Sequence, residues 1–336
     1  MSDIAIIGAG AWGTALSIVL GRRGTHRLCL WAREPEVCQS IQSHRSNDIF
    51  LPGQKIPESV CITNDLSRAL RQAEVVVNVV PSHHARRVFE QMAAHLNSGM
   101  IFVSATKGVE ESSLLRMSEV IAQVVSKSAD FSPAIAALSG PTFAQEVARG
   151  DPTAITVASR DSSLAARVQS EFSDPAFRVY TSEDVVGVEL GGSLKNVIAI
   201  AAGICDGLDL GHNTVAALVT RGLAEITRLA VACGAKRETL AGLAGMGDLV
   251  LTCTGGLSRN RTVGVELGKG RKLPEIIAGM HGMVAEGVLT TNAAMGLAQK
   301  FGVEMPITQQ MHAILHDGKA PRDAIRELMT RPGKVE

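Results

Sequence analysis

Two lysines stand where a proton donor could act on a carbonyl group. Lys107 follows a strand-like run at Ile101–Ala105, and Lys195 is almost the only charge in a long apolar segment. Burial disfavours the charged form of a lysine, so we expect the pKa of Lys195 to fall toward the range useful for proton transfer. From composition alone, however, a helix-end lysine that extends its amine to solvent is the better interpretation.

Asp248 also lies in an apolar stretch, where an unpaired carboxylate is costly and a cationic partner is expected. Lys195 is the candidate partner. A polar Ser-Arg-Asn-Arg run begins at Ser258, and guanidinium and amide donors of this kind can hold a phosphate. A solvated loop with basic residues explains that run equally well. Thr142, after another strand-like run, is either a helix N-cap or a hydroxyl contact.

The amino-terminal residues carry a glycine pattern that is typical of dinucleotide binding. Gly8, Gly10 and Gly13 form a G-x-G-x-x-G between a strand-like run and an amphipathic segment. Gly8 permits the tight turn, Gly10 lets the backbone approach a pyrophosphate, and Gly13 allows close helix–strand packing. The helix N-terminus then offers unpaired N–H groups to the anion. The alternative is a glycine-rich turn without a ligand.

The end of the second predicted strand bears on the choice of nicotinamide cofactor. NAD-specific folds place an acid here, which holds the ribose 2′-hydroxyl. This chain instead has Ala32, followed by Arg33 and Glu34. Arg33 could pair with a 2′-phosphate, so we expect NADPH to be accepted as well as NADH. Alternatively, Arg33 is a solvated surface charge and Glu34 serves the ribose.

These residues need a scaffold, and the sequence predicts one with two domains. Short β-branched runs alternate with helix-like segments in the first half, which is typical of βαβ units. The predicted strands are Ile4–Ile7, Arg27–Trp31, Val60–Thr63, Val75–Val80, Ile101–Ala105, Ala134–Leu138, Ala154–Ala158 and Phe177–Tyr180. We therefore predict an α/β Rossmann-like domain over residues 1–185, with a doubly wound, mostly parallel sheet.

Beyond about residue 184 the pattern becomes helical, which predicts an all-α domain over residues 186–336. Val197–Ile204 is expected to be a buried core helix, too short to span a membrane. Asn213–Cys233 predicts a long helix, with Asn213 as its cap and Gly234 as its stop. A cleft between the two domains is the expected ligand site.

Composition excludes several other classes of protein. The 336 residues contain 33 Lys+Arg and 33 Asp+Glu, so the net charge suggests neither a nucleic-acid nor a membrane-surface partner. The start of the chain lacks the features of a signal peptide. The six cysteines form no C-x-x-C pair, which fits a reducing cytoplasm. Histidine and cysteine spacing suggests no metal site.

Taken together, the motifs resemble the bacterial soluble glycerol-3-phosphate dehydrogenase family in order and spacing across nearly the whole chain. The resemblance is carried by Gly8–Leu16, Lys107-Gly108, Ser139–Ala144, Leu194–Val197, Gly247–Leu249 and Ser258–Arg261. Ala11 departs from the pattern, because many members carry serine there. The missing hydroxyl removes one hydrogen bond and leaves the backbone contacts intact.

The resemblance implies a role for each matching residue. Lys195 would be the proton donor in carbonyl reduction, and Asp248 would hold it in place. The substrate site would comprise Lys107, Gly140, Thr142, Lys195, Asp248, Ser258, Arg259 and Asn260. The cofactor site would comprise Gly8, Gly10, Ala11, Trp12, Gly13, Arg33, Lys107, Ala144, Arg259, Val284 and Glu286.

The implied activity is the NAD(P)H-dependent reduction of dihydroxyacetone phosphate to sn-glycerol 3-phosphate for glycerophospholipid synthesis. The resemblance also implies a cytoplasmic homodimer that needs no metal. Two other interpretations remain open. A related β-hydroxyacid-type reductase would use the cluster that begins at Ser258 to bind a carboxylate. A non-catalytic NADPH sensor would need neither Lys195 nor Asp248.

Overall fold

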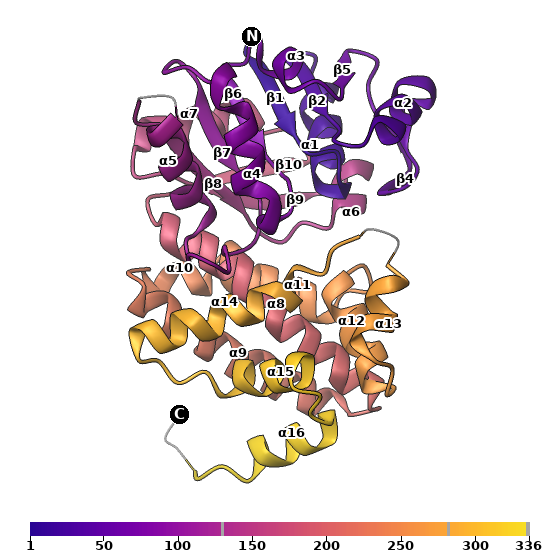
Figure 1. Ribbon diagram of the computed structural model, residues 1–336, viewed down its shortest axis with the longest axis vertical. Helices are drawn as coiled ribbons and strands as arrows, with labels where there is room; N and C mark the ends of the chain where they lie inside the picture. Colours follow the sequence, from indigo (N-terminus) through magenta and orange to yellow (C-terminus); the bar gives the residue numbers. More distant parts are fainter. Residues whose placement is uncertain (129–130, 281–282, 334–336) are drawn as a thin grey trace.

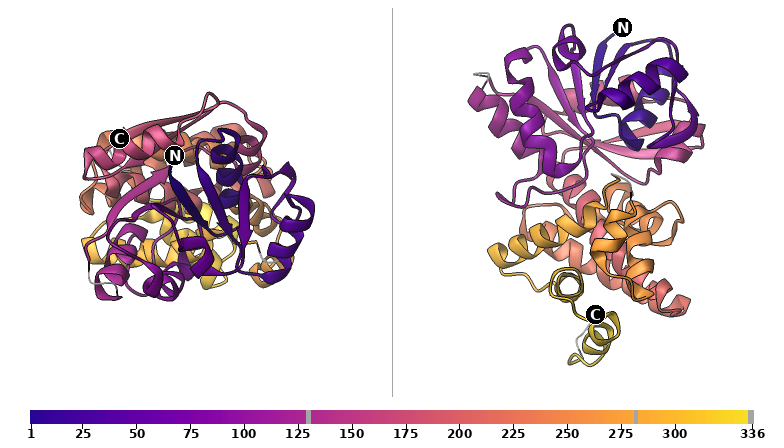
Figure 2. Two further views of the ribbon diagram at one scale, coloured as in Figure 1. Left: turned by 90° about the horizontal axis from the view of Figure 1, so that it is seen from above. Right: turned by 45° about the vertical axis from the view of Figure 1, so that its right-hand side comes forward.

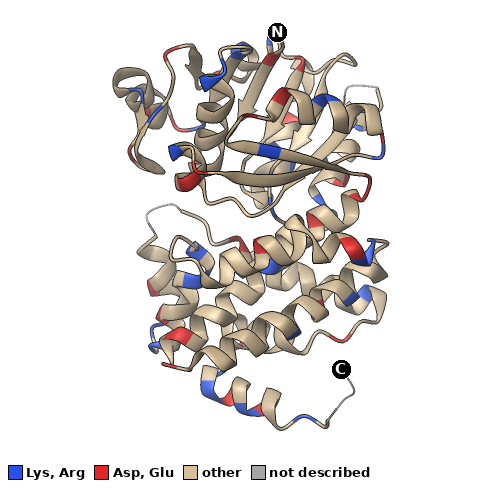
Figure 3. Cartoon of the chain, turned by 180° about the vertical axis from the view of Figure 1, so that it is seen from behind, with Lys and Arg blue, Asp and Glu red and all other residues tan. Residues whose placement is uncertain are grey.

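The computed structural model describes residues 1–128, 131–280 and 283–333, which form an α/β part and a helical part. Figure 1 shows the sheet and its flanking helices above a separate group of helices. The amino-terminal residues and the last described helix, Pro321–Met329, lie at opposite ends of the molecule, as the right-hand view of Figure 2 also shows. In Figure 3 acidic and basic residues are interspersed over both parts, in keeping with the balanced net charge.

Eight strands form one sheet in the order β10-β9-β8-β7-β6-β1-β2-β5. Their bounds are β1 Asp3–Ile7, β2 Arg27–Trp31, β5 Val60–Thr63, β6 Val75–Asn78, β7 Ile101–Ser104, β8 Ala134–Ser139, β9 Thr153–Ala158 and β10 Phe177–Ser182. Neighbouring strands run parallel, except that β8 pairs with β9 in the antiparallel direction. All eight predicted strands are present, and the prediction of a mostly parallel sheet is confirmed.

Helices cover both faces of the sheet, which explains why its strands are apolar without alternation. On one face α1 (Ala11–Arg22) and α7 (Ser162–Phe172) pack into the core, and on the other face α4 (Ser82–Met92) and α5 (Met117–Ser128) do so. The shorter helices of this part are α2 Pro35–His44, α3 Leu66–Leu70, η1 Ala93–His95 and α6 Ala144–Arg149. The strand order reverses between β1 and β6, and ligands bind at such a switch point, beside the carboxyl ends of the strands.

A small antiparallel hairpin, β3 (Ser46–Asn47) with β4 (Leu51–Lys55), lies outside the main sheet. The sequence patterns do not predict it. β4 reads Leu-Pro-Gly-Gln-Lys, which lacks the alternation of a half-buried strand and contains two residues that are depleted in strands. The hairpin matters for the site, because its tip reaches the pocket described below.

The second half is helical, as predicted. Its elements are α8 Val185–Gly207, α9 His212–Ala232, α10 Arg237–Ala241, the π-helical turn η2 Leu243–Gly247, α11 Asp248–Thr254, α12 Arg259–Gly268, α13 Leu273–Ala278, α14 Glu286–Phe301, α15 Pro306–His316 and α16 Pro321–Met329. α9 begins after Gly211, whose backbone is its N-cap, so the prediction that Asn213 caps this helix is wrong. Gly234 follows α9 with a φ of +98°, the left-handed conformation expected of a helix stop.

α8 is the central helix of this part and runs well beyond the predicted Val197–Ile204 segment. It is long and apolar enough to cross a membrane by length and composition alone, but 94% of its most apolar window is buried inside the protein. Glycines let α12 approach it closely. A Cβ at Gly203 would lie 2.0 Å from the carbonyl oxygen of Arg261, and one at Gly264 would lie 2.0 Å from that of Ile200. The expectation of a buried core helix is therefore confirmed.

Candidate active site

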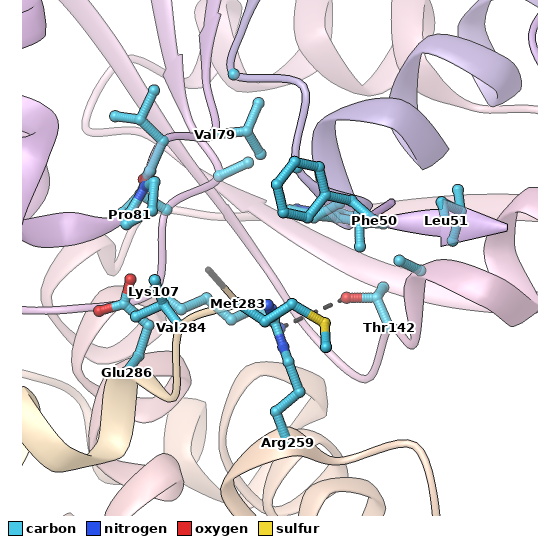
Figure 4. A pocket seen from close by; sticks show the side chains of 18 of the residues that line it. Phe50, Leu51, Val79, Pro81, Lys107, Thr142, Arg259, Met283, Val284 and Glu286 are labelled. Carbon is cyan, nitrogen blue, oxygen red and sulfur yellow. Dashed lines mark hydrogen bonds between the residues drawn. The ribbon is translucent and has the colours of Figure 1, made fainter. Parts of the chain in front are cut away.

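One cavity of about 460 Å³ collects residues from both parts of the chain. Its walls come from the carboxyl ends of β1 and β6, the hairpin tip, and residues near the starts of α11, α12 and α14 (Figure 4). The predicted site residues that line it are Gly8, Gly10, Ala11, Trp12, Arg33, Lys107, Thr142, Ala144, Lys195, Asp248, Ser258, Arg259, Asn260, Val284 and Glu286. Gly13 and Gly140 are the two predicted site residues that do not line the cavity.

The glycine-rich turn has the steric features that a dinucleotide requires. Gly8 has a φ of +120° and approaches Val79 so closely that a Cβ would lie 3.1 Å from the backbone of that residue. A Cβ at Gly13 would lie 1.9 Å from the Gly8 carbonyl oxygen, so only glycine permits this helix–strand contact. A Cβ at Gly10 would meet nothing within 4 Å. The turn is therefore tightly packed at Gly8 and Gly13, whereas its side at Gly10 is open to a ligand.

The N-terminus of α1 is left available to an anion. Its N-cap, Gly10, has no side chain to accept a hydrogen bond from the first N–H groups. The Trp12 indole nitrogen is buried and has no hydrogen-bond partner within the described parts of the chain. Unpaired donors beside an open turn are suited to a pyrophosphate. The residues present therefore fit a dinucleotide cofactor.

Arg33 and Glu34 lie together at the edge of the pocket. The Arg33 Nε donates to Glu34 Oε1 at 2.7 Å, and the two side chains form an ion pair. The Arg33 side chain is 58% exposed, so its guanidinium could also turn toward a ligand. Both residues line the cavity, and the sequence-based choice between them as the ribose contact stays a prediction.

Asp248 lies between two lysines at the other end of the pocket. Its side chain is only 1% exposed; Oδ1 pairs with Lys195 Nζ, and Oδ2 accepts from Lys107 Nζ at 2.7 Å. The predicted Lys195–Asp248 pair is therefore present, and Lys107 adds a second cation that the sequence did not indicate. Lys195 Nζ also donates to Thr252 Oγ1 at 2.7 Å, a partner that sequence reasoning missed.

Burial controls the charge state of Lys195. Desolvation lowers the pKa of its amine from 10.5 to about 7, while Asp248 opposes the shift and Lys107 reinforces it. The expectation that burial lowers the pKa of Lys195 is therefore confirmed. An amine with a pKa near neutrality can both donate and accept a proton at physiological pH. The interpretation of Lys195 as a solvated helix-end residue is therefore wrong, because its side chain is buried inside α8.

Lys107 connects the cluster to the end of β8. Its Nζ donates to the Gly140 carbonyl oxygen at 2.9 Å and to Thr142 Oγ1 at 3.5 Å. Thr142 in turn donates to the Gly140 carbonyl at 3.1 Å. Helix α6 is capped by the backbone of Phe143, so Thr142 is a hydroxyl contact and not an N-cap.

The polar run that begins at Ser258 forms the start of α12. Ser258 Oγ accepts from the Arg261 N–H and caps the helix. Asn260 is fixed at both ends of its amide, since it donates to Asn196 Oδ1 at 3.0 Å and accepts from the Gly287 N–H at 3.0 Å. Arg259 makes no hydrogen bond or ion pair with the residues that the structure describes, although the Glu286 carboxylate attracts it electrostatically, and its side chain extends into the pocket (Figure 4). A free guanidinium beside oriented amides can bind a phosphate.

Glu286 is the first residue of α14, and its hydrogen bonds to Ser82 of α4 connect the helical part to the α/β part. Its carboxylate accepts from the Ser82 N–H at 3.0 Å and from Ser82 Oγ at 2.5 Å. Burial raises the pKa of Glu286, and the Ser82 hydrogen bonds act against that rise. Val284 lies next to it on the pocket wall.

Several residues that line the cavity are absent from the site predicted from the sequence. Phe50 comes from the unpredicted hairpin. Asn196 belongs to the Leu194–Val197 motif, but the sequence predicts no role for it; it follows Lys195 on α8 and lines the cavity beside it. His84 also lines the cavity; its sequence context predicts a residue at the start of a helix, near the cofactor at most. Among the residues that the structure describes, no group of three or more His, Cys, Asp or Glu side chains could hold a metal.

The fold and the pocket define a two-domain protein of the dinucleotide-binding Rossmann class. Comparison with known proteins makes the assignment specific. The family model for the N-terminus of NAD-dependent glycerol-3-phosphate dehydrogenase matches residues 3–165, and the model for its C-terminus matches residues 184–326. The chain belongs to the NAD-dependent glycerol-3-phosphate dehydrogenase family.

Relatives support this assignment over the full length of the chain. A glycerol-3-phosphate dehydrogenase (NAD(P)+) of Koribacter versatilis is 72% identical over 336 residues, covering 100% of this chain and 99% of that protein. One from Acidobacterium capsulatum is 55% identical over 339 residues, covering 100% of both. The crystal structure of glycerol-3-phosphate dehydrogenase from Coxiella burnetii is 41% identical, with a TM-score of 0.93 over 98% of this chain and 99% of that one.

Proposed function

We propose that the protein is an NAD(P)-dependent dehydrogenase that reduces dihydroxyacetone phosphate to sn-glycerol 3-phosphate for glycerophospholipid synthesis. The relatives at 72% and 55% identity are named for this activity and match along the whole chain. The observation that carries the proposal is that one pocket contains the glycine-rich turn, the Lys107–Asp248–Lys195 cluster and the free guanidinium of Arg259.

The cofactor would occupy the α/β side of the pocket. The turn at Gly8, Gly10 and Gly13, with the N–H groups of Ala11 and Trp12, would hold the pyrophosphate. Arg33 would contact the adenosine ribose or its 2′-phosphate, and the remaining contacts would come from Lys107, Ala144, Arg259, Val284 and Glu286. When bound, the reduced nicotinamide supplies a hydride to the carbonyl carbon of the substrate.

Lys195 supplies the proton that the reduction requires. As the carbonyl carbon gains a hydride, its oxygen becomes basic, and the Lys195 ammonium donates a proton to it; the neutral amine takes a proton back in the oxidation direction. Asp248 and Thr252 hold the amine in place through the contacts described above. With a pKa of about 7, Lys195 can act in either direction near neutral pH.

The phosphate and hydroxyl groups of the substrate would lie toward α12 and β8. Arg259 would bind the phosphate, with Ser258 and Asn260 alongside. Lys107, Gly140 and Thr142 would line the rest of the substrate site. Because Lys107 carries a positive charge at the edge of the cluster, it also favours an anionic substrate.

Organisation and location belong to the same proposal. We place the domain boundary at residues 185–186, at the start of α8, so that the pocket lies between the domains. We also propose a homodimer in the cytoplasm that binds neither nucleic acid nor membrane. Sedimentation equilibrium with the full chain tests the dimer, and a monomer throughout the concentration range would disprove it.

The decisive experiment follows NADPH oxidation by absorbance with the purified protein. Dihydroxyacetone phosphate is compared with unphosphorylated dihydroxyacetone, and NADPH with NADH. Turnover of the phosphorylated ketone alone supports the proposed substrate and the phosphate role of Arg259. Turnover of a keto acid would identify a hydroxyacid-type reductase instead, whereas cofactor binding without any turnover would indicate a sensor.

A further inference from the structure

A buried asparagine outside the predicted site connects two walls of the cofactor pocket. Asn47 lies in β3 and is 1% exposed. Its Nδ2 donates one hydrogen to the carbonyl oxygen of Ala9 at 2.8 Å and the other to Thr14 Oγ1 at 2.8 Å. Ala9 lies inside the glycine-rich turn, and Thr14 is in the first turn of α1. Both amide hydrogens are therefore used to hold the turn and the start of α1.

The amide oxygen of Asn47 holds the tip of the hairpin. Oδ1 accepts from the Phe50 N–H at 3.2 Å, which closes a local turn of the kind that asparagine favours. Phe50 lines the pocket across from Val79, as Figure 4 shows. One side chain therefore links the phosphate-binding turn to the aromatic wall.

The contact with Ala9 also fixes the direction of a donor. In a trans peptide, the carbonyl of one residue and the N–H of the next point to opposite sides. With the Ala9 carbonyl held toward Asn47, the Gly10 N–H points away from it. The Gly10 carbonyl accepts from the Thr14 N–H at 3.0 Å, so the whole turn is constrained. Without Asn47, the peptide could rotate and the N–H groups would lose their common orientation.

We propose that Asn47 is a positioning residue for the cofactor, which sets the glycine-rich turn and Phe50 at a fixed separation. The inference rests on the proposed function, because it takes the ligand of this turn to be NAD(P)H. Asn47 does not line the pocket, so its effect must pass through the residues it holds. It should therefore govern binding of the cofactor and leave binding of the second substrate almost unchanged.

The test compares Asn47→Asp and Asn47→Ala with the wild-type protein. Aspartate keeps the shape and the bond from Phe50, but it cannot donate to Ala9, and its charge faces that carbonyl. If the peptide rotates, the cofactor loses a hydrogen bond to its charged pyrophosphate, and a loss of this kind weakens binding about 10- to 100-fold, at about 1.4 kcal/mol per tenfold. We expect the Kd for NADPH, measured by the fluorescence of the bound cofactor, to rise by this factor. The KM for dihydroxyacetone phosphate at saturating NADPH should change less than about threefold, because Asn47 does not touch that site.

Asn97→Ala is the matched control. Asn97 lies in the same domain and accepts from the Gly99 N–H at 3.0 Å in another local turn, but it is exposed and does not line the pocket. The Asn97→Ala variant should bind NADPH as tightly as the wild-type protein does. Circular dichroism and thermal unfolding establish that each variant is folded. Should both Asn47 variants fail to fold, Thr14→Val removes one acceptor and is expected to raise the Kd severalfold.

The outcomes separate this inference from the proposed function. Folded Asn47 variants that bind NADPH as tightly as the wild type overturn the positioning role. An equal loss in NADPH affinity and in dihydroxyacetone phosphate KM also overturns it, since a general structural defect would produce that result. A wild-type protein that binds no NADPH would instead show that the proposed function itself is wrong.

Discussion

The two ends of the pocket are suited to charged groups in different ways. At the proposed cofactor end, a contiguous turn from Gly8 to Thr14 offers backbone N–H groups, and no charged side chain lies within it. At the proposed substrate end, Lys107, Lys195 and Asp248 come from three distant places in the chain and meet in a buried cluster. The first arrangement depends on local steric fit, and the second depends on the whole fold.

This difference determines how strongly a single charge should matter. Asp248 is almost fully buried between two cations, and both Asp248 and Lys107 alter the pKa of Lys195. Arg33 and Glu34 form an exposed pair at the cofactor end, where solvent screens the interaction. Loss of a charged group from the buried cluster should therefore lower the rate more than loss of one from the exposed pair.

The largest effect is expected for Lys195→Ala. It removes the proposed proton donor, and positioned acid–base groups contribute about 10²- to 10⁴-fold to a rate. We expect kcat for reduction of dihydroxyacetone phosphate to fall by a factor in that range. The Kd for NADPH should stay near the wild-type value, because the glycine-rich turn does not contact Lys195. Stopped-flow absorbance measures the rate, and cofactor fluorescence measures binding.

Lys195→Arg serves as the companion variant. It keeps a positive charge at the site, but a guanidinium does not release its proton near neutral pH. It should remain nearly as inactive as Lys195→Ala. A Lys195→Ala protein with full activity would remove this residue from the mechanism and would leave the comparison between the two ends without its main support.

The same difference explains which features the sequence alone could predict. The glycine-rich turn and the eight strands depend on neighbouring residues, and the structure contains all of them. The Lys195–Asp248 pair could be anticipated because two opposite charges in apolar segments need partners. The cap of α9 could not be predicted in this way, because the backbone of Gly211 occupies the N-cap position that Asn213 was expected to fill.

Long-range polar contacts escaped prediction because no local pattern marks them. Lys107 pairs with Asp248 across 141 positions, and Ser82 bonds to Glu286 across 204. Neither Lys107 nor Ser82 lies in an apolar segment that would demand a partner. Asn47 belongs to this group as well, since the hairpin that carries it has a weak strand signal.

A smaller effect is expected at the cofactor end, for Arg33→Ala. If the guanidinium turns from Glu34 to a 2′-phosphate, its loss removes a charge-assisted hydrogen bond at a solvated position, which weakens NADPH about tenfold. NADH lacks that phosphate, so its Kd should change little. Glu34→Gln is the control, since it releases Arg33 and should not weaken NADPH. Equal losses for both cofactors in Arg33→Ala would rule out the phosphate contact, and no loss for either would favour Glu34 as the ribose ligand.

The smallest effect is a displacement of the pH profile by the neighbours of Lys195. Reduction needs the protonated amine, so kcat/KM should fall as the pH rises through about 7. Asp248 raises the pKa of Lys195 and Lys107 lowers it. Asp248→Asn should therefore move the descending limb to lower pH, and Lys107→Met should move it to higher pH. One pKa unit corresponds to about a tenfold change in rate at fixed pH, and we expect shifts of that size or less.

Only the position of the limb is diagnostic in these two variants, because both residues also belong to the proposed substrate site and their loss lowers the overall rate. Shifts in opposite directions would establish that the two neighbours tune one amine from opposite sides. A common direction, or a limb that does not move, would mean that another group titrates. Asp248 and Lys107 would then not control the pKa of Lys195. The two ends of the pocket would differ only in whether their residues are contiguous in the sequence or come from distant positions.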